Sequence, residues 1–211
     1  MAATEASPEA APWFEMLESR RVHDGFIKLD CDRVRQRRFD GGWTPPLLRE
    51  IVRARAAVAV ICYDPGLDRV VLVEQARLPA QIAGFGALQT EIVAGLVEPG
   101  EAPEAVACRE VAEETGLGVI GQPVPIAHMI TTPGHSTETV HLYCARIDAR
   151  GAGGTHGVAA EHEDIRVLSL TLDEFAARLA DGRIANSFSL VAGFWLIAQR
   201  DRLRAAWRSP P

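Results

Sequence analysis

Three glutamates, Glu110, Glu113 and Glu114, fall within five positions of the chain and are the side chains best placed to do chemistry. They lie in the run AVACREVAEET, which contains no proline and no glycine. On an α-helix, residues at i, i+3 and i+4 project from one side, so the three carboxylates would lie together. Like charges at this spacing repel one another and oppose helix formation, so we expect something to compensate them.

Two interpretations of this cluster differ in chemistry. In the first, the carboxylates form an acidic, hydrated face of an ordinary helix. In the second, they bind a hard divalent cation such as Mg²⁺, which prefers oxygen ligands and retains waters that substrate phosphates can replace. The spacing alone leaves both interpretations open.

The elements around the cluster can be predicted from turn and capping residues. Pro103 suits the first turn of the helix and Gly116 suits the residue that ends it. We expect the side opposite the glutamates to pack on a sheet. That side carries Ala105, Cys108, Val111 and Ala112.

The region from Ala56 to about Leu170 has the pattern of a mixed α/β core. It contains apolar runs that predict strands: AAVAVICYD, RVVLVEQAR, EIVAGLVE, PIAHMITT, TVHLYCARI and IRVLSL. An amphipathic helix follows, with Thr171 as its N-cap and Gly182 at its end. A second helix over about Ser187–Trp207 closes the chain.

The region before this core has a different pattern. Residues 13–55 alternate polar and apolar residues around an Asp-Gly-Gly turn in FDGGW, which predicts a small β-rich N-terminal unit. Residues 1–12 are small, acidic and Pro-containing, so we expect a disordered N-terminus and no signal peptide.

Composition excludes several classes of protein. The formal net charge of −6 over 211 residues argues against a general nucleic-acid or membrane-surface binder. No apolar run is long enough to span a bilayer. The cysteines Cys31, Cys62, Cys108 and Cys144 show no metal-type spacing, so we expect them to be reduced and structural, in a cytoplasmic protein.

The segment around the glutamates resembles the Nudix box at every defined position. Gly95 is followed after five residues by Glu101, and after seven more by the run REVAEETGL, residues 109–117. This resemblance implies an α/β/α sandwich with a mixed β-sheet over residues 56–211, in the broad α/β (α+β) class. It also implies an enzyme that hydrolyses a nucleoside diphosphate linked to another moiety.

The same resemblance implies roles for the box residues. Glu110 and Glu114 would be the principal metal ligands, assisted by Glu113 and by the carbonyl of Ala94. Arg109 would hold the glutamates in position, while Glu101 would be mainly structural. The metal would be Mg²⁺, with Mn²⁺ as an alternative, because metal ions neutralise a diphosphate and activate a water.

Residues beyond the box resemble those of bacterial ADP-ribose pyrophosphatases. Pro133 lies sixteen positions after Leu117, where a proline is typical of that group. Further matching segments are EQARLPA, TPGHSTE, THGVAAEHEDIRV and GRIANSFSLVAGFWL. The resemblance implies cleavage of ADP-ribose to AMP and ribose 5-phosphate by a homodimer, in which the N-terminal unit packs across the two-fold axis.

Further site residues follow from the resemblance. Glu161 would be the catalytic base, on a mobile loop, and Glu163 a metal-side or second carboxylate. The other residues would bind substrate. Arg77 and Arg49 would contact the diphosphate, Phe26 the adenine and Glu138 the terminal ribose, and Pro133 would bind substrate as well. Phe26 and Arg49 would then serve the pocket of the partner subunit.

Two alternatives remain for the function. One is a Nudix enzyme that acts on another nucleotide sugar, such as GDP-mannose. The other is a sensor that binds ADP-ribose without cleaving it. The presence of every carboxylate of the box, and the absence of a basic face that could bind nucleic acid, disfavour the sensor. His135 occupies a position where a glycine is usual, so the terminal sugar is the least defined part of the substrate.

Overall fold

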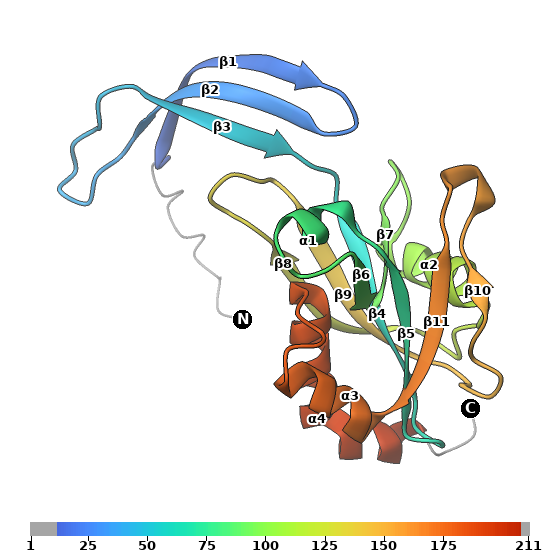
Figure 1. Ribbon diagram of the computed structural model, residues 1–211. Coiled ribbons are helices and arrows are strands. Elements are labelled where there is room, and N and C mark those ends of the chain that lie inside the picture. The colour runs from blue at the N-terminus through green and yellow to red at the C-terminus, as the bar shows by residue number, and fades with distance from the viewer. Residues whose placement is uncertain (1–11, 208–211) are drawn as a thin grey trace, which may run out of the picture. The chain divides into compact units, whose positions relative to one another are not determined.

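The computed structural model describes residues 12–207, so nearly all of the segment expected to be a disordered N-terminus lies outside the described residues. Two compact units make up the chain (Figure 1). The first extends to Ala54 and also includes Ile130–Glu138, a segment that the sequence pattern had placed in the larger domain. The second contains Arg55–Met129 and the chain from Thr139 onward.

The first unit is a three-stranded antiparallel sheet in the order β1-β2-β3. Its strands are β1 (Phe14–Asp24), β2 (Lys28–Gln36) and β3 (Leu47–Arg53). The predicted Asp-Gly-Gly turn joins β2 to β3, and Gly41 takes a φ of 88°, which a glycine adopts without strain. The β-rich character that alternation predicted for this region is therefore confirmed.

The segment 130–138 is tied to the end of β3 by main-chain hydrogen bonds. The N–H of Val52 donates to the carbonyl of His135 at 2.8 Å, and the N–H of Thr137 donates to the carbonyl of Val52 at 3.0 Å. The N–H of Ala54 donates to the Thr137 hydroxyl at 3.0 Å. These bonds explain why the segment belongs to the first unit.

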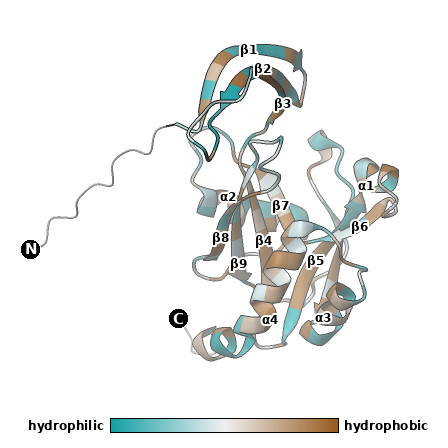
Figure 2. Ribbon diagram, turned by 90° about the vertical axis from the view of Figure 1, so that its left-hand side faces the viewer, coloured by the Kyte–Doolittle hydropathy of each residue, from teal (hydrophilic) through white to brown (hydrophobic). Residues whose placement is uncertain are grey.

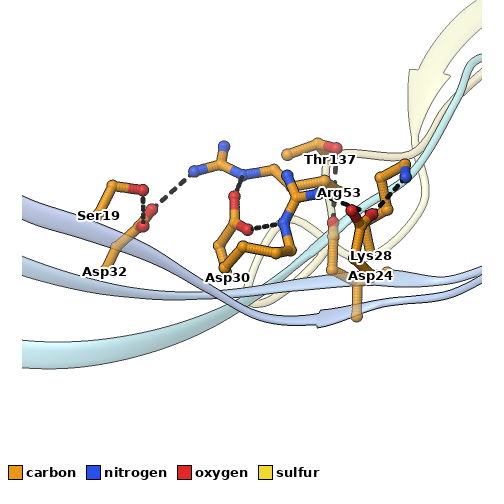
Figure 3. Close-up of polar contacts among 9 residues, drawn as sticks. Ser19, Asp24, Lys28, Asp30, Asp32, Arg53 and Thr137 are labelled. Carbon is orange, nitrogen blue, oxygen red and sulfur yellow. Dashed lines mark hydrogen bonds and ion pairs between the residues drawn. The ribbon is translucent and has the colours of Figure 1, made fainter.

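Two buried aspartates of β2 are paired with arginines inside the same sheet (Figure 3). Arg53 donates from Nε to Asp30 at 2.8 Å and from Nη2 to Asp32 at 2.7 Å. Ser19 adds a bond to Asp32 at 2.6 Å, and Arg21 pairs with Asp30. A buried carboxylate is tolerated only when it is compensated in this way.

The second unit contains an eight-stranded mixed sheet whose order is β10-β11-β5-β4-β9-β8, with β6 beside β5 and β7 beside β4. Strands β4 and β9 run parallel, while β4 and β5 run antiparallel. The bounds are β4 (Ala57–Asp64), β5 (Arg69–Ala76), β6 (Leu88–Glu91), β7 (Val93–Leu96), β8 (Val124–Ile130), β9 (Thr139–Arg146), β10 (Thr155–His156) and β11 (Ile165–Thr171).

Helices cover both faces of this sheet, so the unit is a three-layer α/β/α sandwich (Figure 1). Every residue of β4 is buried, and successive side chains enter different cores because a strand alternates its faces. Ile61 packs with residues of α3 (Leu172–Ala180) and α4 (Ser187–Trp207). Val60 packs with residues of α2 (Pro103–Thr115). Figure 2 shows hydrophobic residues along these central strands. The predicted fold class is confirmed.

The last two helices agree closely with the pattern. The Thr171 hydroxyl accepts the N–H of Glu174 at 3.1 Å, and the Glu174 carboxylate accepts the N–H of Thr171 at 2.8 Å, which forms a capping box. Gly182 follows the end of α3 with a φ of 77°. The final helix has the predicted bounds.

Features that differ from the predicted elements include β10, which lies where no strand was expected. A short helix, α1 (Leu78–Ile82), was not expected. The single strand predicted over EIVAGLVE is interrupted at Ile92, between β6 and β7. The N–H of Ile92 donates to the Ser189 hydroxyl at 3.0 Å instead of joining a ladder, and there the chain passes from pairing with β5 to pairing with β4.

No helix among residues 12–207 combines the length and the apolar character that crossing a bilayer requires. All four cysteines are free thiols, and Cys62 and Cys144 are buried.

Candidate active site

Helix α2 carries its carboxylates on the side that faces the sheet. It begins at Pro103 and ends at Gly116, whose φ of 69° places it in the left-handed region that favours glycine. The expectation that Ala105 and Ala112 pack on the sheet was wrong, because both are exposed. The buried side consists of Val106, Ala107, Glu110, Val111, Glu114 and Thr115. Val111 is buried as expected, but small apolar residues alone do not mark the buried side of this helix, because Glu110 and Glu114 are buried as well.

A glycine opposite the helix makes room for one of these carboxylates. Gly95 lies in β7, and a Cβ added to it would come within 1.9 Å of the Glu110 carboxyl carbon. The carboxyl group of Glu110 therefore rests directly on the backbone at Gly95. This contact explains the glycine without any need for an unusual backbone angle, since its φ is not in the left-handed region.

Glu114 is the more deeply buried of the two inward carboxylates, with 3% of its surface exposed. It accepts a hydrogen bond from the N–H of Ala94 at 3.2 Å. Burial raises the pKa of Glu114 to about 8, the Ala94 bond opposes that rise, and the charges of Glu110 and Glu163 add to it. Burial likewise raises the pKa of Glu110.

Arg109 contacts the carboxylates that the resemblance implies it holds. Its guanidinium lies 2.8 Å from Glu110 and 3.0 Å from Glu113, and it donates to Glu101 at 3.4 Å. One guanidinium can serve several carboxylates because its donors form a fixed, planar fork. Arg109 thus offsets part of the repulsion within the cluster.

The carboxylates of α2 suit a divalent cation, although they are not arranged as a complete set of ligands. Within residues 12–207, no three His, Cys, Asp or Glu side chains converge as metal ligands. Glu110 and Glu113 both contact Arg109, and Glu110 and Glu114 are buried near each other. A cation beside these two would favour their ionised forms, which burial disfavours, and oxygen donors are those that hard cations prefer.

The predicted loop glutamates line a cleft together with Arg77. Glu161 ends a 3₁₀ turn (Ala159–Glu161) and is exposed, while Glu163 is half-buried and accepts the N–H of Val158 at 2.9 Å. The cleft has a volume of about 620 Å³, and Arg77, Glu161 and Glu163 are among its lining residues. Arg77 also donates to Glu91 at 2.9 Å.

The charges of this cleft act on the helix carboxylates. Glu163 raises the pKa of Glu114 and Arg77 lowers it. Both effects are smaller than those of burial, of the hydrogen bond from Ala94 and of the Glu110 charge. Glu163 also contributes to the raised pKa of Glu110. Glu163 therefore lies close enough to Glu110 and Glu114, and Arg77 close enough to Glu114, for their charges to interact.

The remaining predicted substrate-binding residues belong to the first compact unit. Phe26, at the turn between β1 and β2, is 89% exposed, and Arg49 is exposed on β3. Pro133 is exposed in the segment tied to β3. In the same segment, Glu138 accepts a hydrogen bond from the Thr131 hydroxyl at 2.8 Å.

Sequence reasoning missed two pairs of residues, one on the wall of the cleft and one at the base of the loop that carries the glutamates. Arg166 forms an ion pair with Glu74 on the cleft wall. His156 and Gly157 dock the glutamate loop on the end of α2. The His-Gly step in THGVAAEHED was a usable signal, since a glycine at the start of a short loop often takes a conformation closed to other residues.

Comparisons with known proteins agree with this geometry. The NUDIX domain family matches residues 53–189. The ADP-ribose pyrophosphatase of Escherichia coli K12 is 34% identical over 193 residues, which cover 92% of each chain. A GDP-mannose pyrophosphatase of Pectobacterium atrosepticum is 30% identical over 84% of this chain and 90% of its own.

A solved structure supports the fold. The crystal structure of an ADP compounds hydrolase superposes with a TM-score of 0.67 and covers 91% of this chain and 98% of its own, at 17% identity. The Nudix box is thus mounted on the fold that the box predicts. By the domain match and by the similarity over nearly its whole length to a characterised relative, the chain belongs to the Nudix hydrolase family.

Proposed function

We propose that this protein hydrolyses the diphosphate of ADP-ribose and releases AMP and ribose 5-phosphate. One observation carries the proposal. Arg77 and Glu163 line an open cleft, and they lie close enough to the buried carboxylates of α2 for the charges to interact. Carboxylates, an arginine and a cleft are the groups that diphosphate hydrolysis requires. Similarity to the E. coli ADP-ribose pyrophosphatase supports the choice of substrate.

Each residue has a distinct task in this proposal. Glu110 and Glu114, assisted by Glu113 and the carbonyl of Ala94, hold a divalent cation, which we propose is Mg²⁺. When bound, this cation neutralises the diphosphate and lowers the pKa of a coordinated water. Arg77 orients the phosphates, because its guanidinium matches paired phosphate oxygens. Arg109 holds Glu110 and Glu113 in place.

Glu161 is the general base in this scheme. Its carboxylate is exposed at the cleft, so it is free to accept the proton of the attacking water. Glu163 is less free, because its carboxylate already accepts the N–H of Val158. We assign Glu163 to the metal side of the site, in agreement with its influence on Glu110 and Glu114.

The first compact unit would complete the substrate site in a homodimer. Phe26 would contact the adenine and Arg49 the diphosphate in the partner's pocket, Glu138 would contact the terminal ribose, and Pro133 would also bind substrate. Strong exposure of apolar side chains on this unit supports an interface there. These are Trp13, Phe14, Met16, Leu17, Val22, Phe26, Ile27, Phe39 and Leu48. We propose that the enzyme acts in the cytoplasm.

A second candidate substrate is GDP-mannose. Its support is the 30% identity to a GDP-mannose pyrophosphatase over most of both chains. The α2 carboxylates and the loop glutamates would act identically on either diphosphate. The groups that contact the base and the terminal sugar would decide between them.

The first experiment incubates purified protein and Mg²⁺ separately with ADP-ribose, GDP-mannose and NADH, and follows the products by chromatography. We expect AMP and ribose 5-phosphate from ADP-ribose, at a higher kcat/KM than for the other two. Glu114→Gln should lower kcat by roughly 100-fold or more, because it removes a buried metal ligand. A chelator should abolish the activity.

Asp201→Asn is the matched control, since Asp201 is exposed on α4, outside the box and outside the lining of the cleft. It should keep the wild-type kcat. Preferential cleavage of GDP-mannose would overturn the substrate assignment and leave the hydrolase intact. Binding of ADP-ribose without cleavage of any substrate would show a sensor instead.

A further inference from the structure

The loop between β10 and β11 is attached to the carboxylate helix at two adjacent residues. His156 is the last residue of β10 and pairs with Ile165 of β11, so residues 157–164 form the connection. This connection carries both Glu161 and Glu163. Its attachment therefore decides where those carboxylates lie relative to α2.

The first attachment is a contact between the His156 ring and Gly116, the residue that ends α2. A Cβ at Gly116 would lie 2.6 Å from Cε1 and 3.0 Å from Nδ1 of His156, too close for any side chain. The Cε1 edge of the imidazole thus occupies the space that a side chain would need. Gly116 is required twice, by its positive φ and by this ring.

The ring is held in that orientation by its other nitrogen. Nε2 of His156 lies 2.9 Å from the carbonyl oxygen of Gly153. A carbonyl can only accept, so Nε2 carries the proton and donates it. Of the two ring nitrogens, Nδ1 is the one nearer to Gly116.

The second attachment is a main-chain bond from the loop to the helix. The N–H of Gly157 donates to the carbonyl of Glu113 at 3.2 Å. That carbonyl is one of the last four of α2, which have no partner within the helix. Gly157 has a φ of 110°, and a Cβ there would lie 2.7 Å from the Cβ of Glu163, so only glycine fits.

Beyond these two residues the loop is closed on itself. The Glu163 carboxylate accepts the N–H of Val158 at 2.9 Å, and the N–H of Glu161 donates to the carbonyl of Val158 at 2.9 Å. Glu161 and Glu163 are therefore both tied to Val158, the residue next to Gly157. Its position is set where it is anchored, at His156 and Gly157.

We propose that His156 is a positioning residue for catalysis: its ring, seated on Gly116, anchors the glutamate-bearing loop to the end of the carboxylate helix. His156 touches neither substrate nor metal in this role. It fixes the distance between the loop carboxylates and those of α2. The expected effect on kcat rests on the proposed function, whereas the anchoring of the loop does not.

The test compares His156→Ala with His156→Gln, whose amide nitrogen can reach the Gly153 carbonyl as Nε2 does. His156→Ala should lower kcat by about 10- to 100-fold and leave KM within about 2-fold, because small displacements of reacting groups cost this much. His156→Gln should recover most of the lost kcat. His128→Ala is the matched control: His128 is exposed and stacks on His141, and it should keep the wild-type kcat.

A readout without substrate separates the anchor from the activity. By hydrogen–deuterium exchange, His156→Ala should expose the amides of Gly157 and Val158 and leave the exchange of α4 unchanged. A double-mutant cycle adds Gly116→Ala. Its methyl group collides with the ring in the wild type and enters vacated space in His156→Ala, so the two effects on kcat should be clearly non-additive.

Several outcomes would overturn the proposal. These are unchanged exchange at Gly157 and Val158, a fall in kcat that comes with exchange rising throughout the second unit, and additive effects in the cycle. If the wild type cleaves neither ADP-ribose nor GDP-mannose, the proposed function fails. The exchange experiment would then still decide whether His156 anchors the loop.

Discussion

At the scale of single residues, the site depends on buried charge and on the glycines that make space for it. Glu110 and Glu114 face the sheet, and burial raises the pKa of each. A soluble protein keeps such groups inside only where they are compensated or used. Burying these two carboxylates lowers the stability of the fold, and this loss indicates that the helix carries a functional site.

Gly95 offers a direct test of that packing. Gly95→Ala should displace the Glu110 carboxylate, because the added Cβ would lie 1.9 Å from its carboxyl carbon. We expect kcat for ADP-ribose to fall by about 100-fold. Gly118→Ala is the control, since nothing lies within 4 Å of a Cβ at that position. Equal activities of the two variants in a steady-state assay would contradict the role given to Gly95.

At the scale of elements, the N-terminal sheet is held by ion pairs where a larger domain would use an apolar core. Arg53→Met would leave the fully buried Asp32 with Ser19 as its remaining described partner. We expect the sheet to lose about 3 kcal/mol, because removing one partner strands a buried charge. Hydrogen exchange of β2 and β3 should accelerate accordingly.

Arg20→Met is suited as the control for this experiment, because Arg20 is exposed on β1 of the same sheet. It should change exchange little, in line with the small energies of exposed charges. Protection of β2 that survives Arg53→Met would show that the ion pairs do not hold the sheet.

At the scale of the whole molecule, the apolar exposure of the first unit predicts association. Sedimentation velocity should give twice the chain mass of 22.9 kDa. A double substitution of exposed β1 residues, Met16→Lys and Leu17→Lys, should shift the protein to monomer, because charged side chains are costly to bury. Leu67→Lys, at an exposed site of the second unit, should leave the mass unchanged. A wild-type monomer at micromolar concentration would exclude the proposed homodimer.

The fold class, most elements and the family follow from the amino-acid sequence alone. Strands such as Ala57–Asp64 and the helix Ser187–Trp207 follow from local periodicity, and Pro103, Gly116 and Thr171 mark ends through local backbone chemistry. The box is recognisable because its residues are close in sequence, so their spacing is visible without a structure.

The direction in which the α2 carboxylates face, and the contacts that hold the loop with Glu161 and Glu163, could be learned from the three-dimensional structure alone. Periodicity shows which residues share a side of a helix but does not show which side is buried. The space that the Glu110 carboxyl group occupies lies against Gly95, which belongs to a different element. The contact of His156 with Gly116 joins residues forty positions apart. The attachment of residues 130–138 to β3 is equally non-local. Such contacts depend on how strands and helices pack, and no short stretch of sequence records that.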